Sequence, residues 1–126
     1  MSGETDLARL LATMAPRRDP VPYAFRTLAA GETVPADAIG TFREDEGLSI
    51  VAPAKAGETA FARLTLTVHS SLEAVGLTAA VSTALTGHGI SANVVAAAFH
   101  DHVFVPWGRA DDAMAALAAL AQPPSE

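Results

Sequence analysis

The sequence predicts an α+β fold in which helices cover one face of an antiparallel sheet. Alternating apolar residues mark strands in both halves of the chain, two alanine-rich segments have helical periodicity, and the connections are short. The 126 residues suffice for one domain or for two very small halves that share a core. A connector around residues 53–59 divides the chain, so we expect an amino-terminal half over residues 1–58, a carboxy-terminal domain over 59–122 and a disordered tail over 123–126.

The first half is predicted to contain one helix and two strands. The helix has an apolar stripe at positions i, i+3, i+4 and i+7, formed by Leu7, Leu10, Leu11 and Met14. Pro16 stops it. Alternating side chains predict a strand over residues 20–28, and an apolar run predicts another over 48–51. A loop rich in glycine and proline and a charged stretch, residues 42–47, separate these strands.

The second half is predicted to contain strand, helix, strand, strand and helix. These elements are a strand over 64–68, a helix over 77–86, a strand over 90–99, a hairpin turn at His100-Asp101-His102, a strand over 103–105 and a helix over 110–120. This order favours a split β-α-β sheet of the ferredoxin-like βαββαβ type, because parallel strands need a helical crossover. The second half lacks a fourth strand, which the first half can supply unless its strands build a sister sheet.

Composition excludes several classes of function. The net charge is −6 and no basic cluster is longer than Arg17-Arg18, which argues against nucleic-acid binding. The absence of cysteine excludes disulfides, iron–sulfur clusters, thiolate zinc sites and cysteine nucleophiles. No apolar run approaches the length of a membrane span, and no basic segment followed by an apolar one opens the chain. We therefore expect a cytoplasmic protein without a cofactor.

The second half resembles the ACT domain, a small regulatory module that binds amino acids. The residues that fall on the family's pattern are Gly76, Leu77, Ala84-Leu85 and Gly89-Ile90, whereas Asn93 is displaced from the usual asparagine. The stretch from Phe42 to Val51 is similar to a signature of the tandem ACT-like branch related to arginine sensors and aspartokinase regulatory regions. The chain as a whole thus resembles a bacterial family of stand-alone tandem ACT-like proteins.

The resemblance implies a binding protein, with its ligand between the loop after the first strand and the second strand of a neighbouring unit. The residues that it nominates are Ser70, Ser71, Leu72, Gly76 and Leu77 on the loop and Ala92, Asn93 and Val94 on the strand. ACT domains usually regulate an enzyme, so a partner enzyme is implied. We also expect a homodimer, because exposed strand edges in so small a unit need covering.

The predicted loop also has a chemical rationale of its own. Unpaired amides at the start of a helix attract anions, so an amino acid's carboxylate could bind near Gly76 and Leu77. The alternative is that Ser70 and Glu73 form a capping box that satisfies the same amides. Both arrangements can coexist.

The charged stretch of the first half offers the complementary charges. Glu44, Asp45 or Glu46 could pair with a ligand's ammonium group, and Arg43 could bind its carboxylate in a bidentate manner. The alternative is an ordinary solvated turn.

The sequence gives weaker support to two other functional classes, a metal-binding protein and an enzyme. His69, His100 and His102 could bind zinc or nickel, although an ordinary polar turn is the favoured interpretation of His100 and His102. No glycine-flanked nucleophile turn accompanies the serines beside His69, so we expect no enzyme. A ligand-free interaction module, which binds a partner through a sheet edge and Trp107, is the principal alternative.

Overall fold

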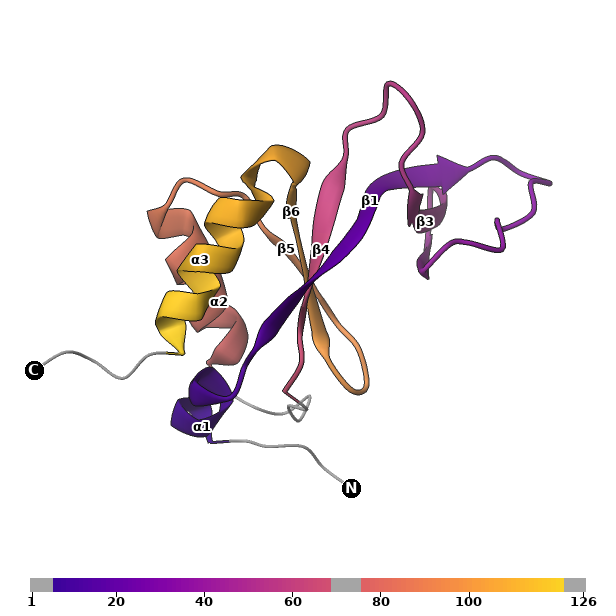
Figure 1. Cartoon of the computed structure of the whole chain (residues 1–126). Coiled ribbons are helices and arrows are strands. Elements are labelled where there is room, and N and C mark those ends of the chain that lie inside the picture. The colour runs from indigo at the N-terminus through magenta and orange to yellow at the C-terminus, as the bar shows by residue number, and fades with distance from the viewer. Residues whose placement is uncertain (1–5, 69–75, 122–126) are drawn as a thin grey trace, which may run out of the picture.

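The second half of the chain folds in the predicted order. The computed structural model describes residues 6–68 and 76–121 (Figure 1). Its elements are α1 (Leu7–Ala12), β1 (Pro16–Leu28), β2 (Gly40–Glu44), β3 (Gly47–Pro53), β4 (Phe61–Leu66), α2 (Leu77–Gly87), β5 (Asn93–Ala96), β6 (Asp101–Pro106), the 3-10 turn η1 (Trp107–Arg109) and α3 (Ala110–Leu120). None of the helices in these described ranges is long and apolar enough to cross a membrane.

The strands form one antiparallel sheet in the order β2-β3-β1-β4-β6-β5. Strands β4 and β5 flank β6 and are joined through α2, which is the split β-α-β unit that the sequence predicts. Strand β1 of the first half lies on the other side of β4. A first-half strand therefore completes the ferredoxin-like sheet of the second half, which is one of the two arrangements that the sequence leaves open.

Strand β1 belongs to both parts of the sheet. Residues 16–23 pair with β4 and residues 23–28 pair with β3, with a shift of register between Arg18 and Pro22. The predicted start at Pro20 is thus wrong by four residues. Proline lacks an amide donor, but it is tolerated at the first position of a strand and at irregularities, which is where Pro16 and Pro20 lie. Figure 1 shows β1 bending between β4 and β3.

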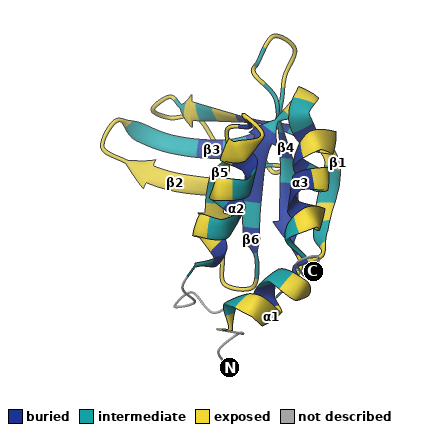
Figure 2. Cartoon of the chain, turned by 90° about the vertical axis from the view of Figure 1, so that its left-hand side faces the viewer, coloured by how far each residue is buried: buried dark blue, intermediate teal, exposed yellow. Residues whose placement is uncertain are grey.

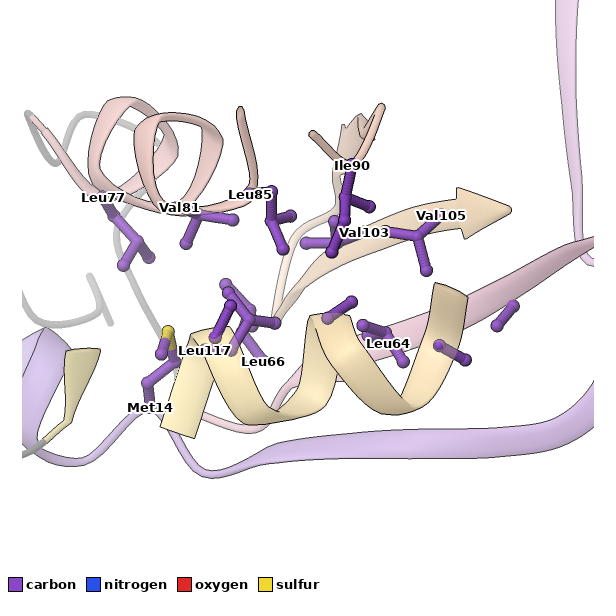
Figure 3. Packing of buried hydrophobic residues seen from close by; sticks show 14 of the residues in the cluster. Met14, Leu64, Leu66, Leu77, Val81, Leu85, Ile90, Val103, Val105 and Leu117 are labelled. Atoms are coloured by element: carbon purple, nitrogen blue, oxygen red, sulfur yellow. The ribbon is translucent and has the colours of Figure 1, made fainter. Parts of the chain in front are cut away.

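Helices α2 and α3 cover the same face of the sheet (Figure 1). Alternate residues of β4 and β6 point to this face and pack against both helices (Figure 3). Among the residues that the structure describes, the largest fully buried side chains are Leu10, Met14, Ile50, Leu64, Leu66, Leu85, Leu117, Val81, Val103 and Val105. Each such side chain contributes roughly 1.5–3 kcal/mol through burial. Alanines at positions 110, 113 and 116 let α3 lie close to the sheet.

The predicted hairpin turn at His100-Asp101-His102 is wrong. Asp101 pairs with Ala96 and His102 pairs with Val95, so both residues belong to β6. The turn instead covers residues 97–100, where the Ala97 amide donates to the His100 carbonyl at 3.1 Å. Two polar residues at the start of a strand resemble a turn in sequence, and only the pairing with β5 distinguishes them.

The charged stretch 42–47 also divides differently from the prediction. Its first three residues belong to β2, where Phe42 pairs with Ser49, and only Asp45 and Glu46 form the turn to β3. Strand β2 is an outer strand and is exposed over most of its length (Figure 2). An outer strand tolerates charged side chains on both faces, which hides its alternation in the sequence.

The remaining elements keep their order but their bounds shift, most of all for the strand expected over residues 90–99. Helix α1 ends at Ala12, yet Met14 beyond it is still fully buried. The strand expected over residues 90–99 is confined to β5, whereas Ile90 is buried in the core. Helices α2 and α3 lie where the periodicity places them.

Candidate functional site

The predicted ligand loop reaches α2 at Gly76. Gly76 precedes the helix with φ 100° and ψ −18°, a left-handed conformation that favours glycine, and it provides no side-chain cap. The Cδ2 atom of Leu7 lies 3.0 Å from the position that a Cβ of residue 76 would occupy. Leu77 is buried in the core. One side of the amino end of α2 is therefore covered by α1, which the sequence analysis does not foresee.

The predicted strand residues follow the carboxy end of α2, so within one chain they lie at the opposite end of this helix from Gly76. Asn93 opens β5, is exposed and pairs with Phe104. Ala92 and Val94 are half-buried and pack against the core. Because β5 is an outer strand, its free edge faces outward from the sheet.

Part of the predicted site lies outside the described residues. These residues are Ser70, Ser71 and Leu72, together with Glu73 of the alternative capping box and His69 of the alternative metal site. Their roles stay predictions.

The charged residues Arg43, Glu44, Asp45 and Glu46 are all exposed on β2 and its turn. The hydroxyl of Ser49 donates a hydrogen bond to Glu44. Glu46 and Glu32 line an open hollow of about 510 Å³ beside the end of β1. Strands β2 and β5 are opposite outer strands, but the sheet is curled, so that Gly40 of β2 and Val95 of β5 line one cavity, and none of these four charged residues lines it.

A polar cluster that the sequence analysis misses lies on the sheet face away from α2 and α3, which we call the open face. Arg63 of β4 donates from Nη2 to Oδ2 of Asp19 at 2.6 Å. The Tyr23 hydroxyl donates to the same oxygen at 2.8 Å, and the Val21 amide donates to Oδ1 at 2.9 Å. The Arg63 guanidinium also lies over the Tyr23 ring, 5.5 Å from its centroid. The shift of register in β1 positions Asp19 for these bonds.

These contacts set the protonation of the cluster. Burial raises the pKa of Asp19, but the hydrogen bonds from Val21, Tyr23 and Arg63 outweigh it and leave the pKa below its ordinary value. Burial and the neighbouring Asp19 carboxylate raise the pKa of Tyr23. The cluster therefore holds a carboxylate, a neutral phenol and a guanidinium at neutral pH.

His102 lies beside this cluster on the open face. Its Nδ1 forms a hydrogen bond of 3.0 Å with Thr65 Oγ1. Burial lowers the pKa of His102, the positive charges of Arg63 and His100 lower it further, and Asp101 opposes them. The imidazole is therefore held neutral to lower pH than a free histidine.

Arg63 and His102 line a cavity of about 140 Å³ between the two ends of the curled sheet. The lining residues are Ile39, Gly40, Val51, Arg63, Val95, Ala97, His102 and Phe104. A polar hollow of about 270 Å³ also adjoins Arg63, and its lining residues are Arg17, Arg18, Asp19, Pro20, Arg63 and Thr65. Arg63 is common to both. No pattern in the sequence points to it, because Arg63 directly precedes the strand predicted over residues 64–68, which in the structure begins at Phe61.

The alternative metal site finds no support within residues 6–68 and 76–121, which contain no group of three potential ligands. His100 Nδ1 donates to the Val68 carbonyl at 3.3 Å, whereas His102 bonds to Thr65. The two imidazoles thus have separate partners.

Solved structures with a similar fold include a protein of unknown function from Vibrio cholerae, described as a possible transport protein. It is 46% identical, with a TM-score of 0.73, and the match covers 86% of this chain and 91% of that one. A protein from Agrobacterium tumefaciens has 23% identity and a TM-score of 0.62 over 80% of this chain and 84% of its own, which shows the fold alone. No curated protein matches the chain.

Two family models match the sequence, and both describe an ACT domain. One matches residues 2–71 and the other residues 62–119. ACT domains are regulatory modules that generally bind small molecules and oligomerise, and they are not catalytic. Because the first match covers more than half of the chain and the second covers the split β-α-β unit, the chain belongs to the ACT-domain family as a tandem ACT-like protein.

Proposed function

We propose that the chain is a cytoplasmic regulatory module that binds an amino acid between the amino end of α2 and the carboxy end of strand β5. The observation that supports this most is the start of α2 at Gly76, without a side-chain cap from that residue. The first amides of a helix have no partner within it, so Leu77, Thr78 and Ala79 can donate to a ligand's carboxylate. Leu7 supplies an apolar wall beside them.

A second copy of the chain completes the proposed site. The ligand's ammonium group needs a negative partner, and Glu44, Asp45 and Glu46 lie on β2, the outer strand opposite β5. In a two-fold dimer with β2 of each copy against β5 of the other, both sites gain these carboxylates at once. The same pairing covers both exposed edges.

Calorimetric titration with each of the twenty amino acids tests the proposal. We expect heat of binding from one or a few of them and a raised melting temperature, because a ligand that binds only the folded state stabilises it. Replacing Glu44, Asp45 and Glu46 together by Gln should weaken that binding by about tenfold, the effect of losing one hydrogen bond to a charged group. Asp112→Asn, an exposed acid of α3, is the matched control. Absence of heat and of any melting shift with all twenty would contradict the proposal.

A ligand-free interaction module is the second candidate, and Phe42 favours it. Its side chain is 74% exposed on the outer strand β2, which is unusual unless another surface covers it. Trp107, the residue expected to serve this role, is 37% exposed and already lies under Arg18, 4.7 Å from the guanidinium carbon. Light scattering that shows stable dimers without any ligand, together with calorimetric titrations that give no heat, would favour this candidate. A bulky residue at Gly76 cannot separate the two candidates, because it also displaces Leu7.

A further inference from the structure

The Arg63 guanidinium has more hydrogen-bond donors than it has acceptors around it in the described ranges. It carries five N–H groups, and within the described ranges its one hydrogen-bond acceptor is Asp19. Its Nε is buried and has no partner there. Leaving donors of a charged group unpaired is costly. Because Nε is itself out of reach of solvent, the donors that an anion in an adjoining cavity can meet are those of the Nη atoms.

The cavity beside Arg63 is apolar apart from that residue and His102. Ile39, Val51, Val95 and Phe104 form its walls, and they come from both ends of the curled sheet. Its volume of about 140 Å³ equals that of four or five water molecules, at roughly 30 Å³ each. A ligand that fits this volume and these apolar walls has a short aliphatic chain, and Arg63 suits a negatively charged end.

We propose that this cavity binds a short-chain carboxylic acid, with the carboxylate on Arg63 and His102 and the aliphatic tail against the apolar walls. No acidic residue lines the cavity, so an α-ammonium group would be desolvated there without a counter-charge. Asp19, the carboxylate of the polar cluster, already accepts three hydrogen bonds. The site therefore discriminates against amino acids and is separate from the one proposed at α2.

Binding at this site is linked to protonation of His102. The groups that act on this imidazole are Arg63 and Thr65 of β4 and, from its own segment, His100 and Asp101. Arg63 in turn contacts Asp19 and Tyr23 of β1. A bound carboxylate offsets the positive charge of Arg63, so the His102 pKa should rise on binding and affinity should increase as the pH falls from 8 to 6.

Titration of the full chain with isovalerate, with isovaleramide as the uncharged isostere, tests the proposal. We expect saturable binding of isovalerate, an upward shift of the His102 pKa measured by NMR on the ring protons, and at least tenfold weaker binding of isovaleramide and of L-leucine. Equal affinity for acid and amide, or no binding of isovalerate, would overturn the proposal. A response to L-leucine without one to isovalerate would leave the proposed amino-acid site intact, so the two proposals fail separately.

Two variants and one control localise the effect. Arg63→Gln should weaken isovalerate binding at least tenfold, whereas Arg26→Gln, whose parent pairs with Glu58 away from the cavity, should not change it. Gly40→Leu fills the cavity instead of changing its charge, and a Cβ at this position meets only Val51 at 4.0 Å. If Arg63→Gln does not fold, Gly40→Leu decides: unchanged affinity in that variant would overturn the proposal.

Discussion

Arg63 lies where the open face changes from aromatic to polar side chains. Along β4, Phe61 is followed on this face by Arg63 and then by Thr65, and Phe61 packs edge-on against Phe25 at 5.4 Å. The aromatic part of the face is held together by ring contacts and the polar part by the bonds of Asp19. The Arg63–Asp19 pair is mostly buried, with side chains 25% and 15% exposed. Removing one partner of such a pair leaves the other buried and unpaired, which is more costly than losing a surface ion pair.

Asp19→Asn should therefore destabilise the fold by about 1–3 kcal/mol at neutral pH. The pKa of Asp19 is lowered by folding, so its carboxylate stabilises the native state above the unfolded pKa near 3.8 and loses this effect as the pH falls through the folded value. The difference in unfolding free energy between wild type and variant should shrink below about pH 4. Urea unfolding between pH 3 and 7 measures it; a difference that does not depend on pH would contradict the assignment.

For single residues, the sequence predicts which side chains are buried better than it predicts their hydrogen-bond partners. The alternation of Leu64 and Leu66 identifies the core face of β4 correctly. The bond between Arg63 and Asp19 joins residues 44 positions apart, and it depends on the register shift in β1. Nothing in local periodicity encodes that shift, so the polar cluster could not be predicted from the sequence.

Among the elements, helix α1 most alters the interpretation of the predicted ligand site at Gly76. It has six residues, too few to be stable alone, and is held by packing of Leu10 in the core and of Leu7 against Gly76. Two observations explain why residue 76 is a glycine: its positive φ and the short distance between Leu7 and the position of a Cβ. The amino end of α2 is thus as much a packing contact as a binding surface.

Gly76→Ala should destabilise the fold by about 1–3 kcal/mol, because a side chain is strained at φ 100° and meets Leu7 at 3.0 Å. In a Leu7→Ala background the cost should fall by about 0.5 kcal/mol or more, since only the backbone term is left. Gly89→Ala is the matched control, because it has φ 69° but nothing within 4 Å. Its cost should be the same in both backgrounds. Thermal or urea unfolding of the variants gives the coupling, and additivity of Gly76→Ala with Leu7→Ala would contradict the contact.

Elements with strong periodicity were predictable and those defined by pairing were not. Helices α2 and α3 follow from apolar spacing alone, because each buries one continuous stripe. Strand β2 and the first residues of β6 are fixed by their neighbours, so charged or polar residues there indicated a turn instead. The order of elements in the second half survives these errors, since it depends on the helical crossover.

At the scale of the whole molecule, the two ACT-like parts share one sheet. Strand β1 pairs with β3 of the first part and with β4 of the second part. The strand pairing therefore continues across the boundary proposed at residue 58. The outer strands β2 and β5 are the two free edges, and residues on both line the cavity of the open face. A single chain thus offers one candidate site within its sheet and another that needs a second copy.

The central claim is that an amino acid binds at the start of α2 against β5. Backbone amide NMR spectra recorded during titration with the amino acid that gives heat test this claim most directly. We predict the largest shifts at Leu77, Thr78 and Ala79 and at Val95 and Ala96, with smaller changes at Arg63 and His102. Shifts confined to the open face, with the amides of α2 and β5 unmoved, would contradict it.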